Sequence, residues 1–195
     1  LATIKALMPK IKRVITPLCV GSHLRYWGMS SEIIEERDWN QSVRVTDSLI
    51  VHVLPARHFS GRGIKRNQTL WASFMLETPE QNIYYSGDSG YGPHFKAIGE
   101  QFGTVDVAIM ENGQYDQDWK FIHMMPEETA QASADLHAKA VVPGHAGRFV
   151  LAKHSWDDPY KRLALASRLK DYRLLTPMLG VLPSYTTLGM AALLP

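Results

Sequence analysis

The segment that most constrains the fold is the run 105–110, VDVAIM, which is apolar at every position except Asp106. A short and nearly continuous apolar run is typical of a strand that is buried on both faces of a sheet. Such a strand needs a covering layer on each side. Amphipathic helical segments stand before and after it, at 93–102 and 126–138, and a second apolar run follows at 140–143. This alternation predicts an α/β fold in which helices pack against a sheet.

The first half of the chain is richer in hairpins than the second half. The segment 42–55 alternates and then becomes continuously apolar, and the runs 70–77 and 82–86 are separated by a four-residue turn, which predicts paired strands. We therefore expect mixed sheets with antiparallel and parallel pairs. The remaining predicted elements are helices at 2–10, 22–28 and 157–170 and strands at 13–17 and 31–36, while 181–195 has no clear period.

Composition gives no sign of more than one globular unit. Of the 195 residues, 45% are hydrophobic and 21% are charged, and the chain contains no repeat or linker, so we expect residues 1–195 to form one domain. A net charge of +2 gives no reason to expect nucleic acid as a partner. The one cysteine, Cys19, fits a reducing compartment, and no run is long enough for a transmembrane segment. We therefore expect a cytoplasmic protein.

Three predicted strands end in short polar turns, each with a side chain that can bind a metal ion. These side chains are His58, Asp88 and His145. Functional groups of α/β folds gather beyond strand ends, where the sheet is rigid and the loops leave access. Two imidazoles and a carboxylate are ligands that suit a catalytic zinc ion. The pattern therefore indicates a metal site built from the loops after these strands.

The strand VDVAIM also ends in a polar residue, Glu111, with His123 a little beyond it. Taken singly, each of these residues has an ordinary structural explanation, because a histidine after a strand is more often a surface residue than a ligand. The turn GDSG around Asp88 is also typical of a β-turn. Ser89 in that turn is a poor candidate for a nucleophile, because the nucleophile elbow has the pattern G-x-S-x-G.

Six segments together resemble the metallo-β-lactamase-fold hydrolases. They are RHFSGRG, TLWASFMLE, YYSGDSGYGPHFKAIGEQFG, AIMENGQYD, HMMPEETAQA and PGHAGRFVLAKHSWDDP. Within that family they are similar to the branch that contains N-acyl phosphatidylethanolamine phospholipase D and its bacterial relatives. The resemblance runs from about residue 1 to about residue 180. It implies an αββα sandwich of mixed β-sheets flanked by helices, with two divalent metal ions, usually zinc, at one edge of the sheets.

The resemblance also implies a role for each candidate residue. His58 would be the third protein ligand of one ion, Asp88 would bridge both ions, and His145 would be a ligand of the other ion. His123 is similar to a family histidine near the substrate phosphate, which orients or protonates it. Asp88 and His123 are therefore the expected catalytic residues. The implied reaction is hydrolysis, of a phosphodiester bond above all, by water that the metal ions activate.

The chain departs from the family pattern near both ends. The motif His-x-His-x-Asp-His, which supplies metal ligands in the family, occurs nowhere in it, and the segment 181–195 does not follow the family pattern. Four of the seven family ligands and the first strands are therefore expected to be missing, which makes the domain incomplete at its N-terminus. The metal content of this chain would then be reduced or nil. Two alternatives stay open: an inactive or non-catalytic fragment, and a lactonase-like hydrolase of the same fold.

The sequence leaves the substrate open between a small molecule and a phospholipid-like compound. An apolar segment, HLRYWGMS, contains Leu24, Tyr26, Trp27 and Met29. It is either a surface for peripheral membrane contact or a part of the core. An incomplete sandwich would also expose sheet edges, which favours homo-oligomers.

Overall fold

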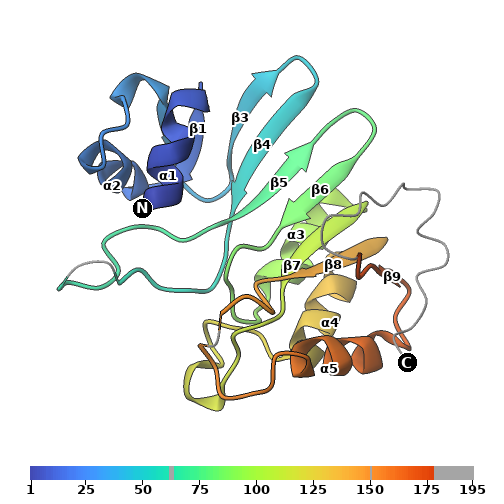
Figure 1. Cartoon of the computed structure of the whole chain (residues 1–195). Helices are drawn as coiled ribbons and strands as arrows, with labels where there is room; N and C mark the ends of the chain where they lie inside the picture. The colour runs from blue at the N-terminus through green and yellow to red at the C-terminus, as the bar shows by residue number, and fades with distance from the viewer. Residues whose placement is uncertain (62–63, 150, 178–195) are drawn as a thin grey trace.

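The structure is a computed structural model that describes residues 1–61, 64–149 and 151–177. Its main feature is a seven-stranded sheet with the strand order β3-β4-β5-β6-β7-β8-β9 (Figure 1). The bounds of these strands are β3 (Gln41–Thr46), β4 (Leu49–Leu54), β5 (Ser73–Glu77), β6 (Asn82–Tyr85), β7 (Val107–Glu111), β8 (Ala140–Gly144) and β9 (Arg173–Leu174).

The direction of the strands gives the sheet two different edges. Pairing is antiparallel from β3 to β6 and parallel from β6 to β9. It follows that β4, β6, β7 and β8 all run in the same direction, and their C-terminal ends lie together along one side of the sheet, which we call the site edge. The side where these strands begin, which we call the turn edge, carries the hairpin turns at 47–48 and 78–81. The turns are at the top of Figure 1 and the loops of the site edge are at the bottom.

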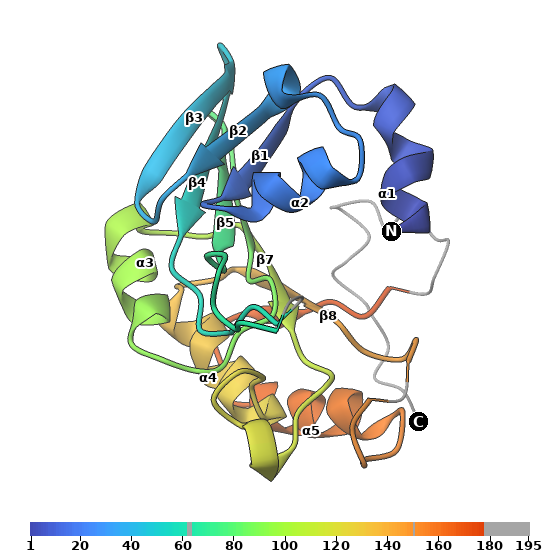
Figure 2. The same ribbon diagram turned by 90° about the vertical axis from the view of Figure 1, so that its left-hand side faces the viewer.

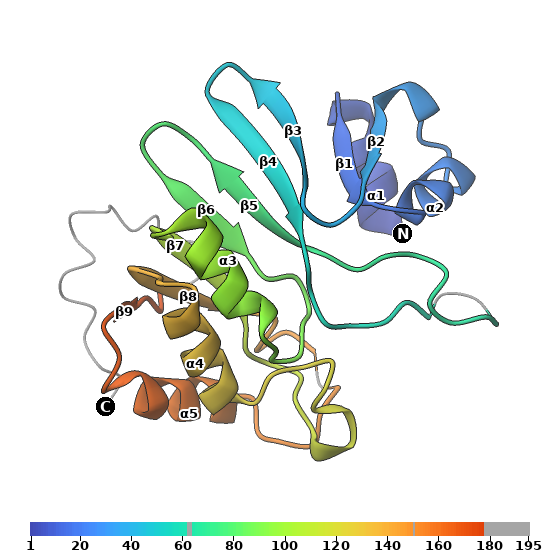
Figure 3. The same cartoon turned by 180° about the vertical axis from the view of Figure 1, so that it is seen from behind.

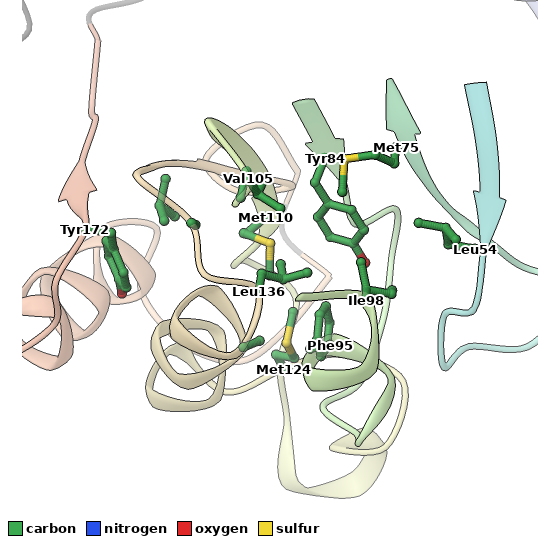
Figure 4. Close-up of a cluster of buried hydrophobic side chains, with 14 residues drawn as sticks. Leu54, Met75, Tyr84, Phe95, Ile98, Val105, Met110, Met124, Leu136 and Tyr172 are labelled. Atoms are coloured by element: carbon green, nitrogen blue, oxygen red, sulfur yellow. The ribbon is translucent and has the colours of Figure 1, made fainter. Parts of the chain in front are cut away.

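Two helices, α3 (His94–Phe102) and α4 (Pro126–Asp135), cover one face of the sheet (Figure 3). The hydrophobic core lies between them and the strands, and Figure 4 shows aromatic and methionine side chains meeting there. Tyr84 from β6, Phe95 from α3 and Met110 from β7 are fully buried in it. The third long helix, α5 (Asp158–Ser167), packs beside α4. This core makes the strands a rigid support for the loops of the site edge.

A smaller unit precedes the main sheet. It consists of α1 (Ala2–Leu7), a 3-10 turn, β1 (Val14–Pro17), α2 (Val20–Tyr26), a second 3-10 turn and β2 (Ile34–Arg37). Strands β1 and β2 are parallel to each other and form a separate two-stranded sheet, which lies near β3 and β4 (Figure 2). No residue of α1 is buried.

The predicted mixed α/β architecture, with a multi-stranded sheet and flanking helices, is confirmed. One predicted strand, 31–36, is partly wrong, because Ser31–Ile33 is a 3-10 turn and β2 begins only at Ile34. The Ser30 hydroxyl accepts a hydrogen bond from the backbone N–H of Glu32 and so stabilises that turn. The predicted departure at 181–195 lies outside the described residues. That residues 1–195 form one domain stays a prediction.

The apolar segment HLRYWGMS divides between core and surface. Leu24 and Met29 are buried, whereas Tyr26 is 86% exposed and Trp27 stacks on the ring of His23. The two interpretations of this segment therefore each describe a part of it.

Candidate metal centre

Asp88 and His145 come together at the site edge from the loops after β6 and β8. The Nδ1 atom of His145 lies 3.6 Å from the Oδ1 atom of Asp88. Gly87 just before the aspartate has φ +59°, and a Cβ there would lie 2.8 Å from the carbonyl oxygen of Ala72, so the turn needs glycine. His145 itself has φ +59°, which is uncommon for a residue other than glycine. Backbone conformations of this kind gather at functional sites.

His58 has one ring nitrogen satisfied and one available. Its Nδ1–H donates to the carbonyl oxygen of Phe59 at 2.8 Å, so Nε2 carries the lone pair. That Nε2 atom is buried and has no hydrogen-bond partner among the described residues. A buried lone pair without a partner is costly unless a proton donor or a metal ion meets it. The unpartnered Nε2 atom fits a metal ligand. Imidazole ligands of metal ions commonly hydrogen-bond to a carbonyl oxygen through their other ring nitrogen, as His58 does.

His123 is held by the carboxylate of Glu111. The imidazole Nδ1 atom is hydrogen-bonded to Oε1 of Glu111 at 2.9 Å, and the glutamate side chain is almost wholly buried. The ring of His123 lies between two of the predicted ligands. Its centroid is 5.2 Å from that of His58 and 5.4 Å from that of His145. The structure thus brings all four candidate residues into one neighbourhood.

The described residues do not form a complete ligand set for one ion. No group of three His, Cys, Asp or Glu side chains within residues 1–61, 64–149 and 151–177 is arranged to hold a metal ion as it stands. The side chains nevertheless have the donor chemistry of a zinc site, with the buried Nε2 of His58 and the Asp88–His145 pair. The assignment of His58, Asp88 and His145 as ligands stays a prediction.

Two glycines let the loops of the site edge approach each other closely. A Cβ at Gly113, just after β7, would lie 2.0 Å from the carbonyl oxygen of His145. A Cβ at Gly90 would lie 2.0 Å from the carbonyl oxygen of Phe121. Neither distance is possible for a real side chain, so backbone packing at glycine fixes the loops that carry Asp88, His123 and His145.

Sequence reasoning named Glu111 as the end of a strand but gave it no function. The available signal was a carboxylate placed directly after a doubly buried strand and twelve positions before His123. Other residues near the site have structural roles. Tyr91 donates its hydroxyl to Asp135, and Asn112 donates to the carbonyl of Pro159. Ser89 is fully buried with its hydroxyl hydrogen-bonded, which agrees with its rejection as a nucleophile.

His94 is a fourth histidine near the turn of Asp88, and its imidazole favours the neutral form. Its Nε2 atom lies 3.4 Å from the hydroxyl oxygen of Ser89, and its ring packs on Phe95. Burial, together with the nearby positive charge of Arg57, lowers the pKa of His94 from 6.5 to about 4.

Cationic and aromatic side chains surround the candidate centre. The guanidinium of Arg57 lies 4.6 Å from the ring centre of Phe121, and the ammonium of Lys120 lies 5.3 Å from it. Arg148 lies over Phe149 in the loop after His145. A pocket opens beside this loop, and its lining includes Gly113, Gln114, Gly147, Phe149, Leu151 and Trp156.

Comparison with solved structures shows which fold this geometry belongs to. The chain is similar to Igni18, a metallo hydrolase of Ignicoccus hospitalis, with a TM-score of 0.68 and 15% identity, over 90% of this chain and 69% of that one. It is also similar to zinc-bound PqqB of Methylobacterium extorquens, with a TM-score of 0.55 and 13% identity, over 90% of this chain and 66% of that one. The chain has the fold of the metallo-β-lactamase class.

Comparison with family models and curated sequences then shows the family. Residues 1–146 match the model described as Beta-lactamase superfamily domain, and the chain belongs to that superfamily. It is 79% identical over 106 residues to Outer membrane protein RomA of Klebsiella pneumoniae, covering 54% of this chain and 80% of RomA. It is 43% identical to Rv0906 of Mycobacterium tuberculosis, covering 85% of this chain and 45% of that protein.

The resemblance to the phospholipase branch is also confirmed, at a greater distance. The chain is 34% identical to the mitochondrial N-acyl-phosphatidylethanolamine-hydrolyzing phospholipase D of Saccharomyces cerevisiae, covering 74% of this chain and 33% of that enzyme. The chain therefore spans less than half the length of the yeast and mycobacterial relatives. None of the helices in the described part of the chain is long and apolar enough to cross a membrane.

Proposed function

We propose that this chain carries part of the metal centre of a hydrolase that cleaves phosphodiester bonds. The observation that carries the proposal is the convergence of His58, Asp88, His123 and His145 at one edge of the sheet. The Nε2 atom of His58 is buried there and has no hydrogen-bond partner in the described part of the chain. Membership of the superfamily and the relatives described as metal-dependent hydrolases support it.

The ligands that this chain offers are His58 through Nε2, His145 and the carboxylate of Asp88. Divalent ions, with zinc the first candidate, would lower the pKa of bound water and stabilise the negative charge that develops on the substrate. The Asp88 carboxylate lies beside His145 and would orient the attacking water by accepting a hydrogen bond from it. His123 would hold the substrate oxygen or move a proton to or from it.

A phosphodiester substrate is favoured by the charges and surfaces next to the centre. Arg57, Lys120 and Arg148 each have a cationic group over an exposed aromatic ring close to the loops of the candidate residues. Cationic groups near a reacting centre stabilise a phosphate oxyanion. The pocket beside Phe149, Leu151 and Trp156 would receive an apolar part of the substrate. A small-molecule or phospholipid-like substrate and peripheral contact with a membrane are consistent with these surfaces.

A second candidate function is a metal-poor, non-catalytic chain. It is favoured by the observation that no three ligands form a complete set within the described residues. For the chain to act as a hydrolase, a second copy of it or another polypeptide would have to supply further ligands. A homo-oligomer is therefore part of the hydrolase proposal. A cytoplasmic location stays a prediction, because the relative RomA is named as an outer membrane protein.

The test is metal content by elemental analysis on the purified chain and on a His145→Asn variant. Asparagine tolerates the left-handed backbone at position 145, so the variant removes the imidazole with little strain. His137→Asn is a matched control, because His137 also has a positive φ, +54°, and lies at the turn edge. We expect bound zinc, manganese or iron in the wild type and in His137→Asn, and a loss of it in His145→Asn.

The same samples are then assayed with bis(p-nitrophenyl) phosphate and with an aromatic lactone. Metal together with phosphodiester cleavage supports the proposal, and metal with lactone cleavage alone replaces the substrate class. Absence of metal from all three proteins, together with absence of hydrolysis, would establish the second candidate and overturn the first.

A further inference from the structure

We infer that Glu111 is a positioning residue that fixes the tautomer of His123, with the proton on Nδ1 and the lone pair on Nε2. The inference rests on the proposed function in one respect, namely that His123 faces the reacting group. Its evidence is the hydrogen-bond arrangement around one buried carboxylate.

Both oxygens of the Glu111 carboxylate are occupied, and their partners differ. Oε2 accepts the backbone N–H groups of Ser89 and Met124, each at 3.3 Å. Oε1 lies 2.9 Å from Nδ1 of His123, within hydrogen-bond distance. An ionised carboxylate accepts hydrogen bonds and donates none. With Glu111 as a carboxylate, the proton between Glu111 and His123 belongs to the imidazole, and a neutral ring is left with its lone pair on Nε2.

The two backbone hydrogen bonds also connect Glu111 with the loops of the candidate centre. Ser89 is the neighbour of Asp88, and Met124 is the neighbour of His123. One carboxylate at the end of β7 thus joins three segments of the site edge. The glutamate is only 2% exposed, so water does not compete for these contacts. The orientation and the tautomer of His123 are therefore set by the same group.

A change from carboxylate to amide has a specific consequence here. In Glu111→Gln, the amide oxygen would take the place of Oε2 and accept the hydrogen bonds of the backbone N–H groups of Ser89 and Met124. The amide NH₂ group then faces Nδ1 of His123, and two donors cannot face each other. The imidazole should take the other tautomer, with the proton on Nε2. Nε2 would then donate toward the centre instead of accepting from it.

The experiment uses the full chain with ¹⁵N-labelled histidine, freed of metal with a chelator, at a pH well above the ordinary histidine pKa of about 6.5. Long-range ¹H–¹⁵N NMR spectra separate protonated from unprotonated ring nitrogens, and a His123→Gln variant assigns the signals. We expect a protonated Nδ1 for His123 in the wild type and a protonated Nε2 in Glu111→Gln. Glu111→Asp, which still only accepts hydrogen bonds, should keep the wild-type tautomer.

Glu77→Gln is the matched control. Glu77 contacts Nε2 of His52 at 2.6 Å, outside the candidate centre, so its variant should leave the signals of His123 unchanged. A protonated Nε2 on His123 in the wild type, or an unchanged tautomer in folded Glu111→Gln, would overturn the inference. If Glu111→Gln does not fold, the wild-type and Glu111→Asp spectra still decide it.

A hydrolysis assay adds an independent measurement. In an active protein, Glu111→Gln should lower kcat on the order of 10-fold to 100-fold with little change in KM, and Glu111→Asp should restore part of it. The NMR result needs neither metal nor turnover. Absence of hydrolysis would therefore count against the proposed function, whereas the wrong tautomer would count against Glu111 as a positioning residue.

Discussion

The two edges of the seven-stranded sheet each hold a histidine–carboxylate pair, and the pairs differ in what surrounds them. At the site edge, the carboxylate of Glu111 is buried and accepts two backbone hydrogen bonds besides that of His123. Toward the turn edge, the side chain of Glu77 is 43% exposed and is hydrogen-bonded to Nε2 of His52. The same two residue types, histidine and glutamate, thus form a fixed pair at the site edge and an adjustable, partly exposed pair toward the turn edge.

The loops at the two edges differ in the same way. The backbone donors of the turn at 78–81 are hydrogen-bonded within the turn, because the Thr78 hydroxyl accepts hydrogen bonds from the N–H groups of Glu80 and Gln81. The loops of the site edge leave the buried Nε2 atom of His58 without a partner among the described residues. Unmet polar groups are expected where a protein binds something, and satisfied turns where it only folds.

The largest difference in stability between neighbouring positions is expected for two glycines of the site edge. Gly113→Ala would place a Cβ 2.0 Å from the carbonyl oxygen of His145, whereas Gly144→Ala would meet nothing nearer than 3.7 Å. We expect Gly113→Ala to lower the free energy of unfolding by about 3 kcal/mol and Gly144→Ala by less than about 1 kcal/mol. Urea unfolding of both variants measures this.

The clash at Gly113 should also move His145, since the contact is with the backbone of that residue. Metal content would then fall in Gly113→Ala and stay unchanged in Gly144→Ala. Equal stability of the two variants would show that the loop after β8 does not pack against the end of β7 in solution.

The sequence was sufficient to predict the order of helices and strands up to α5, but not β9 (Arg173–Leu174), and it placed the candidate residues after strands. The apolar runs at 105–110 and 140–143 are strands, and His58, Asp88 and His145 follow strands at the same edge of the sheet. These features depend on local periodicity and on the parallel direction of strands, both of which are visible in a single sequence.

The contacts between the loops could not be predicted in this way. The Glu111–His123 hydrogen bond and the approach of Gly113 to His145 depend on how distant segments pack. A glutamate after a strand is consistent with a solvated strand end, and its burial becomes visible only in three dimensions. The turn at Ser31–Ile33 was missed for a local reason, because the hydroxyl of Ser30 stabilises a 3-10 turn at the start of the predicted strand 31–36.

An intermediate effect is expected for the pH dependence of stability. Because the pKa of His94 is lowered from 6.5 to about 4 in the folded chain, the unfolded chain binds a proton at higher pH than the folded chain does. The stability from His94 is fully present above pH 6.5 and is lost as the pH falls toward 4. His94 is partly exposed, so the loss should be on the order of 1–2 kcal/mol.

Unfolding of the wild type and His94→Gln between pH 8 and about 4 measures this. The variant should lose less stability than the wild type as the pH falls. His137→Asn at the turn edge is the control, because His137 is exposed and asparagine tolerates its φ of +54°, and the variant should follow the wild type. A wild-type profile identical to that of His94→Gln would show that His94 is not held in its neutral form.

The smallest effect is expected for Glu77→Gln, which tests the opposite side of the comparison. Among the described residues, no backbone N–H group donates to the Glu77 carboxylate, so the amide that replaces it is free to turn either its oxygen or its nitrogen toward Nε2 of His52. A hydrogen bond is kept in both orientations, and an exposed charge is all that is lost. The free energy of unfolding should fall by less than about 1 kcal/mol, and this small difference should shrink further in high salt.

A loss greater than about 2 kcal/mol in urea unfolding would mean that the His52–Glu77 pair is as firmly fixed as the pair at the site edge. The contrast between an adjustable and a fixed carboxylate would then not explain why only one edge of this sheet has the features of a functional site.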